Sequence, residues 1–271
     1  MSTHLSAHLR PFENLPWPNS IKPVVHTLWE WYDALWDISL NPTPEVLIEE
    51  AKRFEKQLPP ILLSPSLAER IFALTQQFSW MKPLLLRQLN ATPQLIPPTH
   101  FETFEALEAF IAELVQPQIY ALAQLADTAH RWQRDMLNEL AKAFFLSAHL
   151  LYLPEDLRHN RLFIPRETLQ QFGVSVEQLK EGPPDESTQR MLWQWKVRAE
   201  VSLSLAYPLA HELPHRYARA FKHWWLGVLE LLRVAESRNF NVWKEPITLS
   251  WLQQTQIRFQ ARFGRLASRN R

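Results

Sequence analysis

The sequence predicts an all-α protein, and three observations lead to this fold class. Apolar residues recur at the i, i+3, i+4, i+7 spacing of a helix that buries one face, most clearly over residues 104–114 and 217–232. The chain has 21 prolines and only four glycines, and its prolines cluster between the periodic segments. Asn-Gly hairpin turns are absent, which argues against a sheet.

The predicted elements follow one another along the chain as helices separated by proline-rich connections. Helices are expected over Leu28–Leu40, Phe104–Leu114, Val197–Leu213, Tyr217–Leu232 and from Leu249 onward. Connections are expected at Asn41–Pro44, Leu58–Pro65, Leu95–Pro98 and Gly182–Pro184. Residues 182–186 are interpreted as a long exposed loop. A mean helix length of about a dozen residues predicts roughly nine to eleven helices.

Composition limits the class of protein. With 271 residues, 46% of them hydrophobic, and 12 tryptophans, the chain has enough apolar surface for a large core, and we interpret residues 1–271 as a single domain. The net charge of +1 gives no reason to expect nucleic-acid binding. Cysteine is absent, which excludes disulfides, thiol nucleophiles and thiolate metal sites.

No run of eighteen apolar residues and no secretory signal is present, so we expect a cytoplasmic protein. The C-terminal segment is strongly basic, because no acidic residue follows Glu245. Five arginines occur there: Arg258, Arg262, Arg265, Arg269 and Arg271. Two interpretations stay open, namely peripheral contact with anionic lipid headgroups at the inner membrane face, or compensation of a helix C-terminus.

An acidic stripe interrupts the otherwise apolar helix expected over residues 28–40. Glu30, Asp33 and Asp37 are spaced by three and then four residues, which places them on one narrow face. Burying unpaired carboxylates is unfavourable, so the stripe must face solvent, a basic partner or a cation. Asp33 and Asp37 form an i, i+4 pair, which makes a metal site one alternative and a salt-bridged or solvated face the other.

Residues 152–165 read YLPEDLRHNRLFIP and resemble the D-x-x-E-D-x-x-x-x-R-x-Y-x-P signature of the squalene/phytoene synthases. Four residues match this signature: Glu155, Asp156, Arg161 and Pro165. Tyr152 stands where the signature has its leading aspartate, and Phe163 stands where it has tyrosine.

Further segments in the same order are similar to this family, and closest to its bacterial hydroxysqualene synthase branch, which acts in hopanoid precursor synthesis. The matching residues are Phe12, Glu13, Asn14 and Pro16, then Thr103, Phe104, Leu107 and Pro117, then Phe172, Gly173 and Val174, and finally the segment Val197–Leu213. The resemblance implies an isoprenoid-synthase-like helical bundle around a central apolar cavity.

The resemblance also implies Mg²⁺-dependent chemistry on isoprenoid diphosphates. Ionising a substrate that carries about three negative charges requires Mg²⁺ ions held by carboxylates on two facing helices. The first of these clamps reads Trp36-Asp37-Ile38-Ser39-Leu40 in place of D-D-x-x-D, and the second keeps Asp156 but has Tyr152 at its partner position.

The candidate site residues fall into two groups. Metal-ligand candidates are Asp33, Asp37, Glu155 and Asp156, and candidates for diphosphate binding are Arg161 and Tyr152. Two functions remain open. The chain is either a homologue with impaired or lost synthase chemistry that binds an apolar isoprenoid chain or a partner protein, or an active hydroxysqualene/squalene synthase-type enzyme with a shifted Mg²⁺ site.

Overall fold

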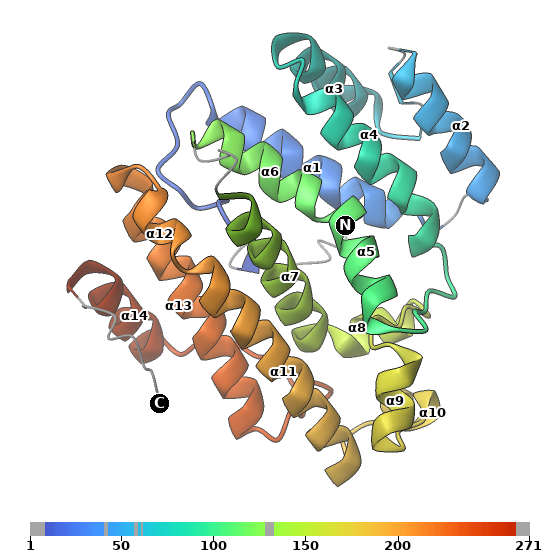
Figure 1. The fold of residues 1–271 in the computed structure, drawn as a ribbon, viewed down its shortest axis with the longest axis vertical. Coiled ribbons are helices and arrows are strands. Elements are labelled where there is room, and N and C mark those ends of the chain that lie inside the picture. The colour runs from blue at the N-terminus through green and yellow to red at the C-terminus, as the bar shows by residue number, and fades with distance from the viewer. Residues whose placement is uncertain (1–8, 41–42, 57–58, 61, 128–132, 264–271) are drawn as a thin grey trace.

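The protein is described by a computed structural model over residues 9–40, 43–56, 59–60, 62–127 and 133–263. Within these ranges the chain forms fourteen α-helices and no strand, which confirms the predicted all-α class (Figure 1). The first seven helices are α1 Lys22–Ile38, α2 Pro44–Glu55, α3 Pro65–Gln77, α4 Met81–Ala91, α5 Phe104–Leu114, α6 Gln116–Leu125 and α7 Arg134–Leu151. The others are α8 Leu153–Arg158, α9 Arg166–Phe172, α10 Val176–Glu181, α11 Glu186–Ala206, α12 Leu209–Glu212, α13 His215–Ser237 and α14 Trp251–Phe263.

The predicted number of helices was too low. Four of the helices, α8, α9, α10 and α12, have seven residues or fewer. Segments of one or two turns are too short to show a helical period in the sequence. The segment Val197–Leu213 also contains a break, since α11 ends at Ala206 and α12 starts after Pro208, which has no backbone N–H to continue a helix.

Proline and polar caps set the helix starts. Pro44, Pro65, Pro117 and Pro154 lie in the first turns of α2, α3, α6 and α8, where a missing N–H leaves no bond unmade. The Thr103 side chain accepts a hydrogen bond from the Ala106 N–H at the start of α5, whose predicted bounds are confirmed. Asp185 caps α11 in the same way, so the connection after α10 is short (residues 182–185) and not the long loop expected there.

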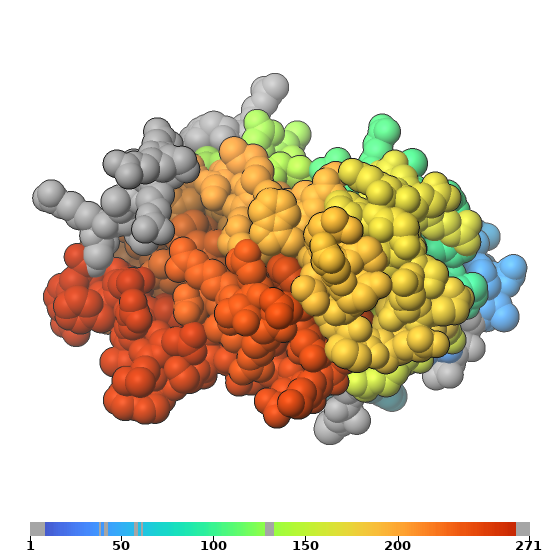
Figure 2. All heavy atoms as spheres, turned by 90° about the horizontal axis from the view of Figure 1, so that it is seen from below, coloured from blue at the N-terminus to red at the C-terminus, as the bar shows by residue number. Residues whose placement is uncertain are grey.

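Helix α7 is central in the bundle. It packs along α11 and also contacts α5, α6, α8 and α13, while α1 packs against α3 and α6 (Figure 1). Helix α14 packs on α13 and lies at one end of the molecule, opposite α2 (Figures 1 and 2). No helix in the described ranges has the length and apolar content needed to cross a membrane.

The core is rich in buried aromatic side chains contributed by α1 and α7. Trp29, Tyr32, Trp36, Phe144 and Phe145 are each at most 2% exposed. Two pockets formed by described residues lie away from this aromatic core, one between α13 and α14 and one beside α8. The predicted central apolar cavity is not one of these two.

Candidate functional site

The candidate site lies where α1, α7, α8 and residues 160–164 meet. Helix α7 ends at Tyr152, which is also the residue before α8, so the signature segment begins at a break between two helices. After α8, Asn160 has a positive φ of 53° and turns the chain back. The carbonyl of Asn160 then accepts from the Thr99 N–H at 3.1 Å, and the Leu162 N–H donates to the Thr99 carbonyl at 2.9 Å. This pairing fixes Arg161 and Phe163 at the interior.

Arg161 is 1% exposed and its donors are directed at the protein itself. Its Nη2 donates to the Trp36 carbonyl at 2.9 Å and to the Ser39 hydroxyl, and its Nε donates to the Leu95 carbonyl at 3.1 Å. Burial lowers the pKa of the guanidinium to about 10, while the nearby charges of Asp156 and Asp37 raise it. Arg161 is therefore protonated at neutral pH and joins the end of α1 to the signature segment.

An aromatic cluster occupies the space between α1 and α7. The Trp36 ring lies 5.2 Å from the His149 ring and 5.7 Å from the Phe163 ring, centroid to centroid. The His149 and Phe163 rings are 4.3 Å apart, and Phe145 contacts both. Trp36 and Phe163 are two of the positions at which the sequence departs from the family motifs. Their rings contact each other, and both contact His149.

Asp156 is buried against this cluster. Its Oδ2 lies 2.7 Å from Nδ1 of His149, and both side chains are less than a tenth exposed. The other ring nitrogen of His149, Nε2, is buried and has no hydrogen-bond partner in the described part of the chain. Asp156 is thus held by a histidine two turns earlier in the sequence.

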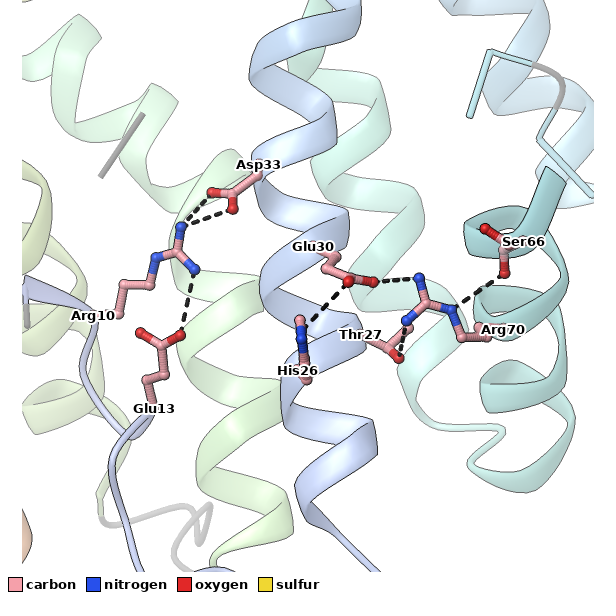
Figure 3. A network of polar contacts seen from close by, with 8 residues as sticks. All are labelled: Arg10, Glu13, His26, Thr27, Glu30, Asp33, Ser66 and Arg70. Carbon is pink, nitrogen blue, oxygen red and sulfur yellow. Dashed lines mark hydrogen bonds and ion pairs between the residues drawn. The ribbon is translucent and has the colours of Figure 1, made fainter. Parts of the chain in front are cut away.

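Two of the three acids in the stripe on α1 face arginines on opposite sides of the helix (Figure 3). Arg10 Nη2 donates to both carboxylate oxygens of Asp33, at 2.7 and 2.8 Å, and its Nη1 donates to Glu13 at 3.4 Å. Glu30 forms an ion pair with Arg70 of α3. Burial raises the pKa of the Asp33 carboxyl, and the Arg10 guanidinium opposes that rise. The sequence left solvent, a basic partner or a cation open for the acidic stripe. Asp33 and Glu30 each have a basic partner.

The remaining candidates, Asp37, Tyr152 and Glu155, are less buried. Asp37 is exposed near the end of α1. Tyr152 and Glu155 line a surface pocket of about 320 Å³ with Arg158 and Lys244, and Glu155 forms an ion pair with Arg158. The six sequence candidates therefore fall into three places. Asp156 and Arg161 are interior, and the exposed Asp37 is close enough for its charge to act on Arg161. Asp33 belongs to the Arg10 pair, whereas Tyr152 and Glu155 line the pocket beside α8.

A Mg²⁺ site requires several oxygen ligands around one ion. In the described ranges, no three carboxylate or histidine side chains are grouped so that they could share a metal ion. Asp33 and Asp156 are each already bonded to a basic or imidazole group of the protein. These residues do not fit a magnesium cluster of the kind that the resemblance implies.

Arg10 and His149 were not identified from the sequence. Arg10 precedes the N-terminal similarity and lies 23 residues before Asp33, so no local spacing connects them. His149 lies seven residues before Asp156, which is two helical turns, but α7 and α8 meet between them and the helical register is not continuous. The seven-residue spacing between His149 and Asp156 is the one local signal of this pair in the sequence.

The arrangement of helices is that of the all-α isoprenoid synthase fold, and three solved structures resemble this chain. The squalene synthase HpnC from Alicyclobacillus acidocaldarius is 16% identical with a TM-score of 0.68, over 83% of this chain and 86% of that one. A dehydrosqualene synthase in complex with ligand is 15% identical with a TM-score of 0.77, over 92% and 88%. YisP from Bacillus subtilis subsp. subtilis strain 168 is 16% identical with a TM-score of 0.55, over 93% and 88%.

The family follows from the sequence. The family model described as squalene/phytoene synthase matches residues 47–257, which is most of the chain, and the protein belongs to that family. A search of curated proteins found no match. Family members are typically Mg²⁺-dependent prenyltransferases. The matched region includes the signature segment at residues 152–165 and leaves α1, with Asp33 and Asp37, outside.

Proposed function

We propose that this protein is a squalene/phytoene synthase family member that has lost the Mg²⁺-dependent chemistry on prenyl diphosphates. The observation that carries the proposal is the contact of Trp36 with His149 and Phe163, at 5.2 and 5.7 Å between ring centroids. In the family signature, Trp36 corresponds to a carboxylate position. Here it fills the space between the two helices with an indole ring.

The charges around this contact support the same function. A diphosphate leaving group needs cations that are available to it, and preorganised charge stabilisation is usually the largest part of such catalysis. The Arg161 donors are bonded to protein carbonyls and to Ser39, and the carboxylates of Asp33 and Asp156 are bonded to Arg10 and His149. Loss of metal ligands at such a site removes several kcal/mol of transition-state stabilisation.

An active synthase of the hydroxysqualene or squalene type is the competing function. It would require Asp33 and Asp37 to form a shifted Mg²⁺ site together with Glu155 and Asp156. The experiment is incubation of the purified protein with farnesyl or presqualene diphosphate and Mg²⁺, with detection of released diphosphate and of apolar product. We expect no release above the protein-free rate. Mg²⁺-dependent turnover that disappears in Asp37→Asn would overturn the proposal, and Asp37 is exposed, so that variant should remain folded.

The proposed ligand of the non-catalytic protein is an apolar isoprenoid chain or a partner protein. Calorimetry with an uncharged isoprenoid alcohol, with and without Mg²⁺, tests the first of these. Binding that is unchanged by Mg²⁺ supports a carrier of apolar chains. If no uncharged chain binds, the partner-protein form of the proposal is retained and the carrier form is discarded.

We further propose that α14 contacts an anionic membrane surface. Four large apolar side chains on this helix are more than three-fifths exposed: Trp251, Leu252, Phe259 and Phe263. Arg258 and Arg262 lie on the same helix, whereas the other three arginines of the basic C-terminus are outside the described residues. An exposed apolar face beside cationic side chains is suited to an anionic lipid interface.

Sedimentation with vesicles tests the membrane contact. Binding is expected to vesicles that contain phosphatidylserine and to weaken in Trp251→Ser/Phe259→Ser. Val46→Ser/Ile48→Ser, which removes exposed apolar side chains from α2 at the opposite end, is the matched control. Equal binding to neutral vesicles, or equal loss in the control, contradicts the proposal.

A further inference from the structure

A pocket of about 830 Å³ is lined by residues of α13 and α14 together with Asn14 and Pro16. Helix α14 lies at one end of the molecule (Figure 1). The volume of the pocket is within the range of about 300–1,000 Å³ that is usual for small-molecule sites. The pocket shares no lining residue with the interior cluster around Trp36, so its chemistry is independent of the lost metal centre.

The charged side chains that line this pocket are all basic. Arg216, Arg219 and His223 come from α13, and Arg258 comes from α14. The whole chain has 29 Lys and Arg against 28 Asp and Glu, so a lining with four basic groups and no acid departs from the balance of the protein. No acidic residue occurs in the parts of the sequence outside the described ranges, so none of them supplies a missing carboxylate.

The three arginines have no carboxylate partner in the described part of the chain. Arg216 stacks on the Tyr217 ring at 4.6 Å, and neither Arg219 nor Arg258 forms an ion pair or hydrogen bond there. Loss of solvent around His223, together with the charges of Arg258 and Arg219, lowers the pKa of its imidazole. The first turn of α13 also has no acidic residue, so the positive end of its helix dipole adds to the same field.

The rest of the lining is apolar. Trp224 and Leu231 of α13, Ile257 and Ala261 of α14, and Leu249 between the two helices contribute apolar side chains to the lining. Gly227 lies in the middle of α13, where glycine is less favourable than alanine, yet a Cβ at this position would meet no atom within 4 Å. The absence of a side chain at residue 227 therefore leaves pocket space open and is not needed for helix packing.

We propose that this pocket binds a phosphate ester with a single apolar chain. The guanidinium groups of Arg216, Arg219 and Arg258 hold the phosphate through charge-assisted hydrogen bonds, and the chain lies on Trp224 and Ile257. Arginine is suited to this task because its planar donors match phosphate oxygens. The proposal does not rest on the function proposed for the interior, since the two sites have no residue in common.

The test is isothermal titration calorimetry of the full-length protein with decyl phosphate below its micelle concentration. Inorganic phosphate and decanol supply the headgroup and the chain separately. Decyl phosphate is expected to bind at one site and at least about tenfold more tightly than either fragment, because both parts of the pocket contribute. Binding of inorganic phosphate or of decanol as tight as that of decyl phosphate overturns the proposal.

Variants assign the site. Arg219→Gln/Arg258→Gln is expected to weaken decyl phosphate binding at least about tenfold, as loss of charge-assisted hydrogen bonds would do. Arg233→Gln/Arg262→Gln removes the same charge from the same two helices outside the pocket and should leave binding within about twofold. Equal losses in the two variants would mean that binding follows net charge, which contradicts a defined pocket.

Gly227→Leu provides a variant that does not change charge. A Cβ at residue 227 would meet no atom within 4 Å and this residue lines the pocket, so the leucine side chain is expected to occupy pocket space and to abolish decyl phosphate binding, with folding checked by circular dichroism. Retention of wild-type affinity in a folded Gly227→Leu protein would place the ligand elsewhere and overturn the proposal.

Discussion

The interior between α1 and α7 and the pocket between α13 and α14 differ in whether their charged side chains are bonded to other protein groups. In the interior, the carboxylates of Asp33 and Asp156 and the guanidinium of Arg161 are bonded to protein groups, and aromatic rings fill the intervening space. At the α13–α14 pocket, Arg219 and Arg258 line an open volume with no carboxylate partner among the described residues. This difference agrees with the two proposals, namely that aromatic packing replaces the family's metal chemistry in the interior and that an anionic ligand binds at the α13–α14 pocket.

The largest effect is expected at Trp36 of α1, because its ring contacts His149 of α7 and Phe163 of the segment after α8. Trp36→Ala should lower the free energy of unfolding by about 3–5 kcal/mol, the usual result of removing a buried aromatic side chain. Urea denaturation followed by circular dichroism measures it. Trp251→Ala, at a residue 71% exposed, is the control and should change stability by less than about 0.5 kcal/mol. Equal small losses would mean that the interior is not packed as described.

Arg161 should have the next largest effect. Arg161→Met leaves the Trp36 and Leu95 carbonyls without their donor, and the free energy of unfolding is expected to fall by about 2–4 kcal/mol. Arg158→Met is the matched control, since the Arg158 side chain is 70% exposed and its pair with Glu155 is worth at most about 1 kcal/mol. A ligand-binding role with no structural role would leave the stability of Arg161→Met near that of the control.

Two acids of α1 form ion pairs that differ in burial: Asp33 pairs with the buried Arg10, and Glu30 pairs with the exposed Arg70 (Figure 3). Arg10→Met should cost about 1.5–3 kcal/mol, because the Arg10 side chain is 8% exposed and Asp33 is left with no cation. Arg70→Met should cost no more than about 1 kcal/mol, since the Arg70 side chain is 45% exposed. The double variant Arg10→Met/Asp33→Asn should recover part of the loss. Additive losses in that double variant would contradict direct coupling.

The smallest effect concerns pH at the open pocket. The folded-state pKa of His223 is lowered from its reference value of 6.5, so the unfolded chain binds more protons near that pH. The stability that neutral His223 contributes is therefore fully present above pH 6.5 and is lost as the pH falls towards its lowered pKa. Lowering the pH from 8 to 5 should therefore reduce the free energy of unfolding of the wild type more than that of His223→Gln. The opposite slope would indicate that a carboxylate faces His223.

The sequence was sufficient for the all-α fold class, although not for the number of helices, because helical period and proline position are local signals. The segment 104–114 shows this, since an apolar period and a capping threonine precede a helix with those same bounds. The one- and two-turn helices around residues 153–181 carry too few residues for a period to appear.

The candidate site was less predictable. The sequence identified the acids but not their partners, because Arg10 meets Asp33 across 23 residues and Arg161 meets Trp36 across 125. Such contacts depend on how distant segments pack, which no local spacing encodes. The open pocket was not predicted either, since the basic residues of α13 and α14 come together only when the two helices pack.

The central claim is that side chains have replaced the metal–diphosphate centre of the family. Titration of the protein with Mn²⁺ as a Mg²⁺ substitute, in the presence of a non-hydrolysable farnesyl diphosphate analogue and monitored by electron paramagnetic resonance, tests it directly. Free Mn²⁺ should follow the control that contains analogue without protein. Stoichiometric uptake of Mn²⁺ that is abolished by Asp37→Asn and retained in Asp185→Asn, an acid that caps α11 outside the site, would contradict the claim.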